Sequence, residues 1–289
     1  MNPTAHYRRH PLFAALRFVI YSNLFIACCA VLMVDQTTRL LLHAAPQAGF
    51  TGFVFFATIC SYSFHWWLTP DIELPSDRLR WLKKNRPVHL VLFFAGLAGS
   101  AWFALALLDH WPWLLLAAFI TFLYSAPKIP HPLFRLLRKV ALGKTIFLAF
   151  VWMYVTTLLP VQLSDRPWQN DFSLFAGSRF FLVYAICILF DYRDRDYDRS
   201  IGIRSLITWL HERGIRFLFI LSLLIFAGLT LLLLPYGHAP GIIGMLLAPG
   251  ILLALLYRRV TRNFSDMVYY LLLDGLMALS ALLTLAAGI

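Results

Sequence analysis

The sequence predicts an all-α integral membrane protein, a single polytopic bundle of about nine transmembrane helices that takes up residues 1–289. Of these residues 60% are hydrophobic and only 13% are charged, far from the balance of a water-soluble domain. The apolar residues form blocks of about 18 to 24, long enough for a helix to cross the hydrocarbon core. The alternating pattern of a membrane β-barrel is absent, so the spans are predicted to be helices.

The predicted spans cover residues 12–34, 47–68, 87–109, 111–127, 141–163, 172–190, 215–235, 239–257 and 268–288. The first follows a basic segment, as in a signal peptide. Its apolar core is too long for one and no small-residue cleavage site stands out, so we expect an uncleaved span.

Basic residues predict the orientation of the bundle. The 25 Lys and Arg residues concentrate near the N-terminus and in the even-numbered loops, whereas the odd loops carry only Arg39 and Arg166. By the positive-inside rule the N-terminus and the even loops are cytoplasmic, and the C-terminus lies outside. The net charge of +11 is thus explained by topology and by anionic membrane lipid, with no need for a nucleic acid partner. We expect a protein of the bacterial inner membrane whose site faces the cytoplasm.

The sixth loop carries the clearest chemical motif, a run of acidic residues from Asp191 to Asp198. If the helix continues through it, Asp191, Asp194 and Asp198 share one face and Asp196 points elsewhere. Carboxylates this close repel one another unless cations neutralise them. Mg²⁺ is one such cation, because it binds carboxylates and substrate phosphates together. A solvated loop balanced by its own arginines is the alternative.

A second acidic stretch lies in the second loop, where Glu73 and Asp77 are four residues apart. Glu73 and Asp77, followed by Arg78, have the same spacing as Asp194 and Asp198, followed by Arg199. Each set comes after an even-numbered span, and the two sets are four spans apart, which indicates a weak internal repeat. Two carboxylate sets would then face each other across the mouth of the bundle. Neighbouring basic residues suit the oxygens of a diphosphate: Arg86, Lys128 and Arg204.

These residues resemble the UbiA superfamily of intramembrane prenyltransferases. The second acidic motif of that family fits in register at Asp191, Asp194, Asp198, Arg199, Gly202 and Arg204. Two further stretches are similar, Tyr124–Pro127 through Gly143, and Asn85-Arg86-Pro87. The expected nine helices extend the resemblance over the whole chain. The first motif departs from the family pattern, since Thr69, Pro70 and Glu73 stand where Asn, Asp and Asp are usual.

The resemblance implies a transferase that moves an isoprenyl group from a prenyl diphosphate to a lipophilic acceptor, a class that includes aromatic molecules. It implies catalytic roles for Asp191, Asp194 and Asp198, and Mg²⁺ held by these three with Glu73 and Asp77. The diphosphate would be bound by Arg78, Arg86, Lys128, Arg199 and Arg204. The apolar bundle would shield the carbocation from water. Two alternatives stay open: a non-catalytic relative that binds an isoprenoid or a partner protein, and an intramembrane terpene cyclase.

Three polar residues inside or at the ends of predicted spans also attract interest. Arg179 lies near the outer interface, where its side chain would snorkel. Asp274 lies about two turns into the last span and needs a partner such as a buried polar group, with a catalytic or acceptor-binding role as the alternative. His65 lies at the end of the second span. Its two interpretations are a capping or interfacial role and a contact with substrate.

Overall fold

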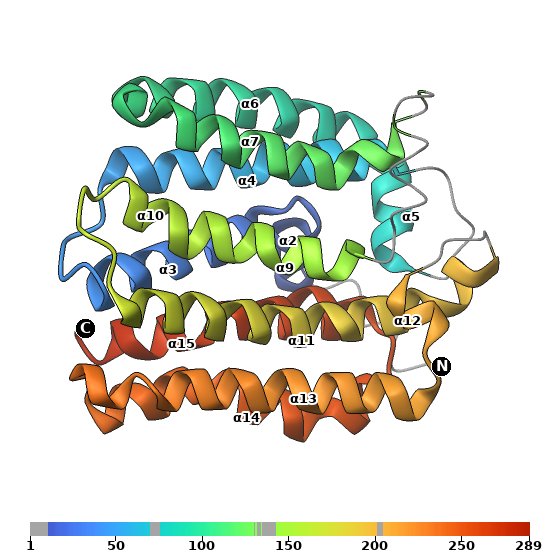
Figure 1. Cartoon of the computed structure of the whole chain (residues 1–289). Helices are drawn as coiled ribbons and strands as arrows, with labels where there is room; N and C mark the ends of the chain where they lie inside the picture. The colour runs from blue at the N-terminus through green and yellow to red at the C-terminus, as the bar shows by residue number, and fades with distance from the viewer. Residues whose placement is uncertain (1–10, 70–75, 130, 132–133, 135–142, 201–204) are drawn as a thin grey trace.

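The computed structural model describes residues 11–69, 76–129, 131, 134, 143–200 and 205–289. Every regular element in these ranges is helical, and none of them is a strand. Most of the long helices run along one common direction, so that the chain passes back and forth through a bundle (Figure 1). This arrangement confirms the predicted all-α class.

The first half of the chain forms α2 (Pro11–Tyr21), α3 (Leu24–Leu40), α4 (Ala48–Trp67), α5 (Asp77–Lys84), α6 (Arg86–Ala104), the 3₁₀ turn η1 (Leu105–His110), α7 (Trp111–Ser125) and the 3₁₀ turn η2 (Ala126–Lys128). The second half forms α9 (Lys144–Met153), the π-turn η4 (Tyr154–Leu158), α10 (Leu159–Gln162), α11 (Asn170–Ser200), α12 (Leu206–Trp209), α13 (Glu212–Leu231), the 3₁₀ turn η5 (Leu234–Tyr236), α14 (Pro240–Val260), the π-turn η6 (Val268–Leu273) and α15 (Asp274–Ala286).

Within the described ranges, six helical stretches are long and apolar enough to cross a membrane, and a bent pair, α2 with α3, brings the number to seven. The six are Arg86–Lys128, Lys144–Gln162, Asn170–Ser200, Glu212–Tyr236, Pro240–Val260 and Val268–Ala286. The first of them contains both α6 and α7, which η1 joins. These lengths support a polytopic membrane protein.

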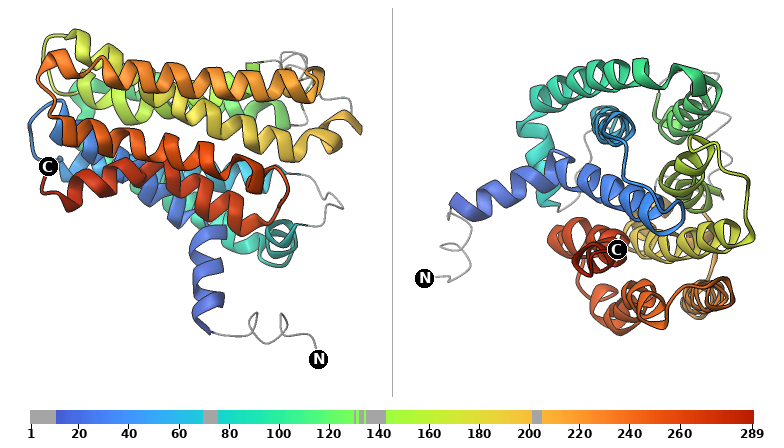
Figure 2. Two further views of the ribbon diagram at one scale, coloured as in Figure 1. Left: turned by 90° about the horizontal axis from the view of Figure 1, so that it is seen from below. Right: turned by 90° about the vertical axis from the view of Figure 1, so that its left-hand side faces the viewer.

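The first predicted span, residues 12–34, is not one straight helix. It breaks at Ser22-Asn23, and α2 and α3 differ in direction by 63°. Asn23 has a left-handed backbone, with φ of 69°, which asparagine tolerates better than most residues. As a result α2 projects away from the bundle (Figure 2), and α3 continues beyond the predicted span to Leu40.

Helix α11 occupies the centre of the bundle and α6–α7 its periphery. In the most apolar window of α11, 72% of the residues are buried inside the protein, against 11% in the Arg86–Lys128 stretch. The peripheral α6 packs closely on α4, because Gly96 lets the two backbones approach. A Cβ at Gly96 would lie 2.6 Å from the backbone nitrogen of Cys60. Small residues of this kind are common where membrane helices cross.

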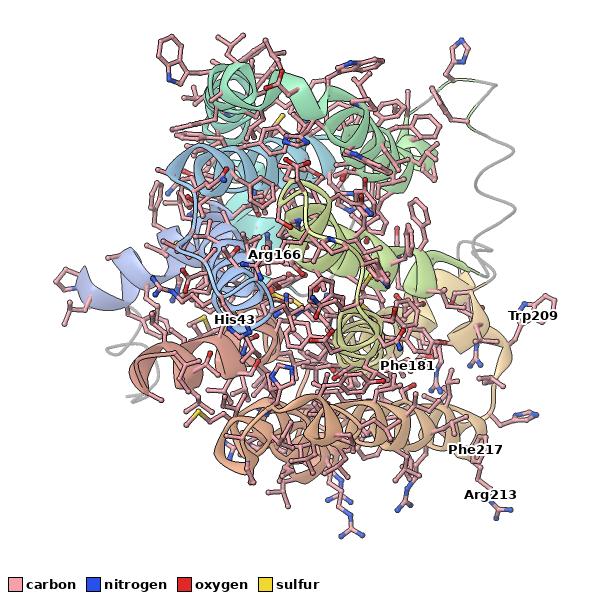
Figure 3. All side chains as sticks on the ribbon, turned by 60° about the vertical axis from the view of Figure 1, so that its left-hand side comes forward. His43, Arg166, Phe181, Trp209, Arg213 and Phe217 are labelled. Atoms are coloured by element: carbon pink, nitrogen blue, oxygen red, sulfur yellow. The ribbon has the colours of Figure 1, made fainter. Side chains whose placement is uncertain are left out.

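Large side chains on the outer helices point away from the protein. Trp209 of α12 and Phe217 of α13 are 59% and 66% exposed, and both project outward beside Arg213 (Figure 3). An apolar side chain at this exposure is favourable in lipid, and a tryptophan and an arginine at a helix end suit the interface with water. The outer surface therefore fits a membrane environment.

A buried arginine, Arg179 of α11, connects three helical segments without any carboxylate. Its guanidinium donates to the main-chain oxygens of Met33 and Thr156, at 2.9 and 2.8 Å. It also donates to side-chain oxygens of Thr37, Thr157 and Gln36. Thr156 belongs to the π-turn η4, and such turns leave main-chain carbonyls outside the regular hydrogen-bond pattern. Arg179 is thus held inside the protein instead of reaching the interface.

Replacing Arg179 by methionine should destabilise the protein by about 2–4 kcal/mol, because several buried oxygens lose their donor. Thermal unfolding in detergent measures the effect. The matched control is Arg39→Gln, which removes only the exposed pair with Asp35 and should change stability by less than about 1 kcal/mol. Equal unfolding temperatures for the two variants would contradict the structural role of Arg179.

Candidate functional site

A large cavity of about 2150 Å³ extends into the bundle. Its interior is mainly apolar and rich in aromatic side chains. They include Phe53, Tyr62, Phe64, Trp66, Phe93, Tyr124, Phe147, Trp152 and Phe180. Most of the charged residues that line it come from α5, the start of α6, η2, the start of α9, the last turns of α11 and the segment before η6, and Asp274 comes from α15. Helices α5 and α12 mark this end of the bundle, at the right in Figure 1. The cavity therefore has a polar mouth and an apolar interior.

The acidic motif lies on the last turns of α11, which continues as a helix to Ser200. Asp191, Asp194 and Asp198 all line the cavity. Asp196 is absent from the lining, and its side chain is 87% exposed. The spacing of three and four residues therefore places the three carboxylates on one helix face, as the sequence predicts.

Each of the three carboxylates has different surroundings. Asp191 accepts a hydrogen bond from the Thr145 hydroxyl, and the Lys144 ammonium lies 3.9 Å from it. Asp194 accepts two hydrogen bonds from Arg193, at 2.8 and 3.3 Å. The Oδ2 atom of Asp198 is buried and has no hydrogen-bond partner in the described part of the chain. Asp198 thus offers an oxygen ready to bind a ligand.

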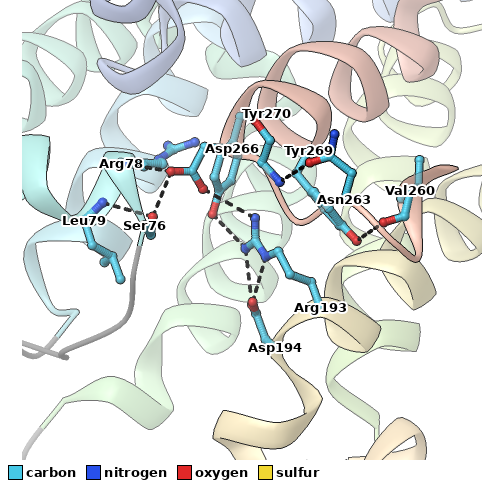
Figure 4. A network of polar contacts seen from close by, with 11 residues as sticks. Ser76, Arg78, Leu79, Arg193, Asp194, Val260, Asn263, Asp266, Tyr269 and Tyr270 are labelled. Atoms are coloured by element: carbon cyan, nitrogen blue, oxygen red, sulfur yellow. Dashed lines mark hydrogen bonds and ion pairs between the residues drawn. The ribbon is translucent and has the colours of Figure 1, made fainter. Parts of the chain in front are cut away.

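Asp266, which precedes η6, connects the second loop to α11 (Figure 4). Its Oδ2 accepts hydrogen bonds from the Ser76 hydroxyl at 2.9 Å and from the main-chain N–H of Arg78 at 2.8 Å. Its Oδ1 lies 3.9 Å from Arg193, which also donates to the Tyr270 hydroxyl at 2.9 Å. Asp266 thus connects the end of the second loop to the last turns of α11, whereas the facing of Glu73 and Asp77 toward the aspartates of α11 stays a prediction.

Arg78 is buried at the mouth of the cavity. It donates to the Asn23 side chain at 2.7 Å, so the break between α2 and α3 provides its acceptor. Its guanidinium lies 4.1 Å from the ring of Trp66 and 4.0 Å from that of Tyr270, in cation–π geometry. Burial lowers the pKa of Arg78 from its ordinary value, and the nearby Tyr270 and acidic groups act against that shift. The aromatic rings fix a cation where it faces the cavity.

Lys128 lies at the cavity wall in a short polar chain. Its ammonium is 2.7 Å from Nε2 of His65 and 2.7 Å from the Thr69 hydroxyl. The His65 ring stacks on Tyr124, and its Nδ1 lies 3.2 Å from the Ser125 hydroxyl. Because Lys128 donates to Nε2, the proton of the neutral ring is assigned to Nδ1. His65 therefore positions Lys128, and Thr69, at the departure from the family motif, contacts the same ammonium.

Of the other predicted site residues, only some line the cavity. Arg86 lines the cavity, whereas Asp77 and Arg199 are absent from its lining. Asp77 pairs with Arg80, and Arg199 donates to the main-chain oxygen of Thr208 at 2.9 and 2.8 Å. Glu73 and Arg204 lie outside the described residues. Roles for these four residues in binding metal or diphosphate stay predictions.

The sequence analysis missed several residues that complete the site: Lys144, Thr145, Arg193, Asp266 and Tyr270. Lys144 and Arg193 were visible only as loop charges. Asp266 is a single acidic residue that follows three arginines in the eighth loop. Its opposite charge is the one feature of the sequence that could have marked it as a site residue. Its partners lie 188 and 190 residues away in sequence, so no local spacing reveals them.

The donor set of the acidic motif is compatible with Mg²⁺. Among the residues that the structure describes, no group of three His, Cys, Asp or Glu side chains converges to hold a metal by itself. Mg²⁺, however, commonly keeps several waters and binds through one or two carboxylates together with substrate phosphates. The unpartnered oxygen of Asp198, beside Asp194 on the same cavity wall, suits that mode.

Comparison of the chain with protein-family models, with curated proteins and with solved structures finds no match. The resemblance to the UbiA superfamily therefore depends on the sequence features described above alone.

Replacing Asp266 by asparagine should loosen α5 from α11, because the bridge between Ser76, Arg78 and Arg193 loses its charge. We expect amide hydrogen exchange in α5 to become about tenfold faster or more, the size expected when a charged hydrogen bond is weakened. Asp196→Asn is the control, since it removes an exposed acid nearby. Unchanged exchange in α5 would show that Asp266 does not connect the two segments.

Proposed function

We propose that the protein is an intramembrane prenyltransferase that transfers an isoprenyl group from a prenyl diphosphate to a lipophilic acceptor with Mg²⁺. One observation carries the proposal. A single large cavity has three carboxylates of α11 and several cations at its mouth, and an aromatic, apolar interior behind them. A prenyl diphosphate has the same two parts, a polyanionic head and a long hydrocarbon tail.

The residues of the chain would divide the work as follows. Arg78, Arg86 and Lys128 face the cavity and can hold diphosphate oxygens, and the ring of Trp66 keeps Arg78 in place. Asp191, Asp194 and Asp198 would hold the metal, which when bound neutralises charge on the leaving diphosphate. The apolar cavity excludes water from the allylic cation, so that an acceptor and not water captures it. Aromatic faces along the wall stabilise that cation.

For the topology, we infer nine spans with the N-terminus in the cytoplasm and the C-terminus outside, in a bacterial inner membrane. Support comes from the charges: the mouth of the cavity holds Arg78, Arg86, Lys128, Lys144 and Arg193, and the positive-inside rule assigns such an end to the cytoplasm. Helices also lie within the ranges of the predicted spans, apart from the break at Asn23, and six or seven stretches of the described residues are long and apolar enough to cross a membrane. Water-soluble prenyl diphosphates would then enter from the cytoplasm.

A non-catalytic relative that binds an isoprenoid is the second candidate. The observation in its favour is that the Arg193 guanidinium already donates to the Asp194 carboxylate and that the Lys144 ammonium lies beside Asp191. Internal cations of this kind neutralise the carboxylates without a metal. Such a protein would bind the diphosphate and leave it intact.

The test is release of diphosphate from geranyl, farnesyl and geranylgeranyl diphosphate by the purified full-length protein, with and without Mg²⁺. We expect release only with Mg²⁺, and a loss of about 100-fold or more in Asp194→Ala and Asp198→Ala, the size typical when charge stabilisation of a transition state is removed. The matched control is Asp196→Ala, which removes an acid of the same motif that faces away from the cavity.

Control activity near that of the unmodified protein would assign the chemistry to the cavity face of α11. No release with any chain length, even after addition of a membrane extract as a source of acceptor, would contradict the transferase and favour the binding protein. Equal losses in Asp196→Ala and Asp194→Ala would show that the net charge of the loop matters and not its cavity face.

A further inference from the structure

A cluster of arginines lies on the outside of the bundle, where α13 begins and α14 ends, at the same end as the mouth of the cavity. All of its members are exposed: Arg213, Arg216, Arg258, Arg259 and Arg262. No hydrogen bond or ion pair joins any of them to the described part of the chain. The acid beside the cluster, Glu212, is held by Arg195 at 2.6 Å. The cluster therefore keeps its positive charge.

Contacts between α13 and α14 place these charges at one level of the bundle. The rings of Phe219 and Tyr257 lie 4.7 Å apart. About two turns further along both helices, Phe226 packs on Gly250, where a Cβ would lie 2.3 Å from the ring. The two helices thus pack antiparallel in one register. As a result, the first turns of α13 lie beside the last turn of α14, and the arginines of both helices gather there.

Each helix also carries exposed apolar side chains directly behind its arginines. On α13, Phe217 and Leu224 share a face with Arg213 and are 66% and 64% exposed, and Phe217 projects outward beside Arg213 (Figure 3). On α14, Leu255 lies one turn from Arg259 and is 75% exposed. The surface thus has a cationic end and an apolar flank. A phospholipid with an anionic headgroup and acyl chains is complementary to both.

The helix dipole explains only part of the cluster. Cations in the last turn of a helix are favourable, which accounts for the arginines of α14. Arg213 and Arg216 lie instead in the first turns of α13, where the dipole adds positive charge to their own. Their repulsion from each other and from the arginines of α14 is relieved when an anion is present.

We propose that the arginine cluster and the apolar side chains behind it form a binding site for an anionic phospholipid. The phosphate accepts hydrogen bonds from the guanidinium groups, which suit it because each can donate two in one plane. The acyl chains lie along Phe217 of α13 and Leu255 of α14. None of the five arginines lines the cavity, so the site is separate from it and does not depend on the proposed transferase function.

Native mass spectrometry of the purified full-length protein in detergent tests the proposal. The probes are phosphatidylglycerol and phosphatidylcholine with identical acyl chains. Both contain a phosphate, but only phosphatidylglycerol has a net negative charge. We expect the first phosphatidylglycerol to bind about tenfold tighter or more, because several arginines act on one headgroup. Equal affinities would overturn the proposal and need no variant.

A soluble headgroup separates a lipid site from a site for free phosphate esters. Glycerol 3-phosphate has the anionic group without acyl chains, and we expect it to leave the bound phosphatidylglycerol in place at equal concentration. Displacement at that concentration would show that the apolar flank contributes nothing, and would overturn the assignment to a lipid.

Two double variants locate the site. Arg213→Gln with Arg216→Gln removes two charges from α13, and Arg258→Gln with Arg259→Gln removes two from α14. Each should reduce the preference for phosphatidylglycerol to less than about threefold. These side chains are exposed, so both variants should unfold at the temperature of the unmodified protein. A full preference in both variants would overturn the proposal.

The matched control is Lys83→Gln with Lys84→Gln, which removes two exposed charges from α5 at the same end of the bundle. We expect this variant to retain the preference for phosphatidylglycerol. A loss equal to that of the arginine variants would show a general attraction between basic segments and anionic lipid, and would overturn a defined site on α13 and α14.

Discussion

The position of α11 is the constraint on which the rest of the structure depends. Two of its arginines, Arg179 and Arg193, bind partners of different charge. Arg179 is bound only by neutral oxygens from α3 and η4, whereas Arg193 is bound by Asp194, Asp266 and the Tyr270 hydroxyl. Gln36, which accepts from Arg179, also contacts Thr284 of α15 at 3.3 Å, so the final helix is fixed to the same group. Because both arginines lie on one helix, their partners set its depth and rotation. That rotation turns the acidic face toward the cavity.

The charges at the mouth explain how three carboxylates coexist on one helix face. Arg193 neutralises Asp194, and Lys144 with Thr145 stabilises Asp191. Asp198 alone retains an oxygen without a partner. In the proposed transferase, a metal ion would therefore find an open oxygen on Asp198 and would compete with the Arg193 guanidinium for Asp194. Since Arg193 also binds Asp266, a shift of Arg193 would alter the contact between α5 and α11. A ligand that displaced Arg193 from Asp194 would thereby also affect the contacts that hold α5.

The sequence predicted the parts of this arrangement that depend on local pattern. Apolar block length located the helices, and the spacing of three and four residues placed Asp191, Asp194 and Asp198 on one face. The break at Asn23 was missed because no glycine or proline marks it, and the π-turns were missed because they interrupt no apolar block. The roles of Asp266 and Arg179 depend in part on partners more than 100 residues away, which spacing cannot reveal. Nine spans and the family remain predictions, because the structure supports six or seven spans and the comparisons have no match.

The interior of the cavity is not purely apolar, because Asp274 also lines it and, among the described residues, no hydrogen bond or ion pair reaches it. A buried carboxyl group in a membrane-spanning helix is costly when charged, and it avoids that cost by staying protonated or by contacting a polar ligand. A leucine at position 274 would fill the same space and need neither. Packing alone therefore does not account for the polar side chain at this position.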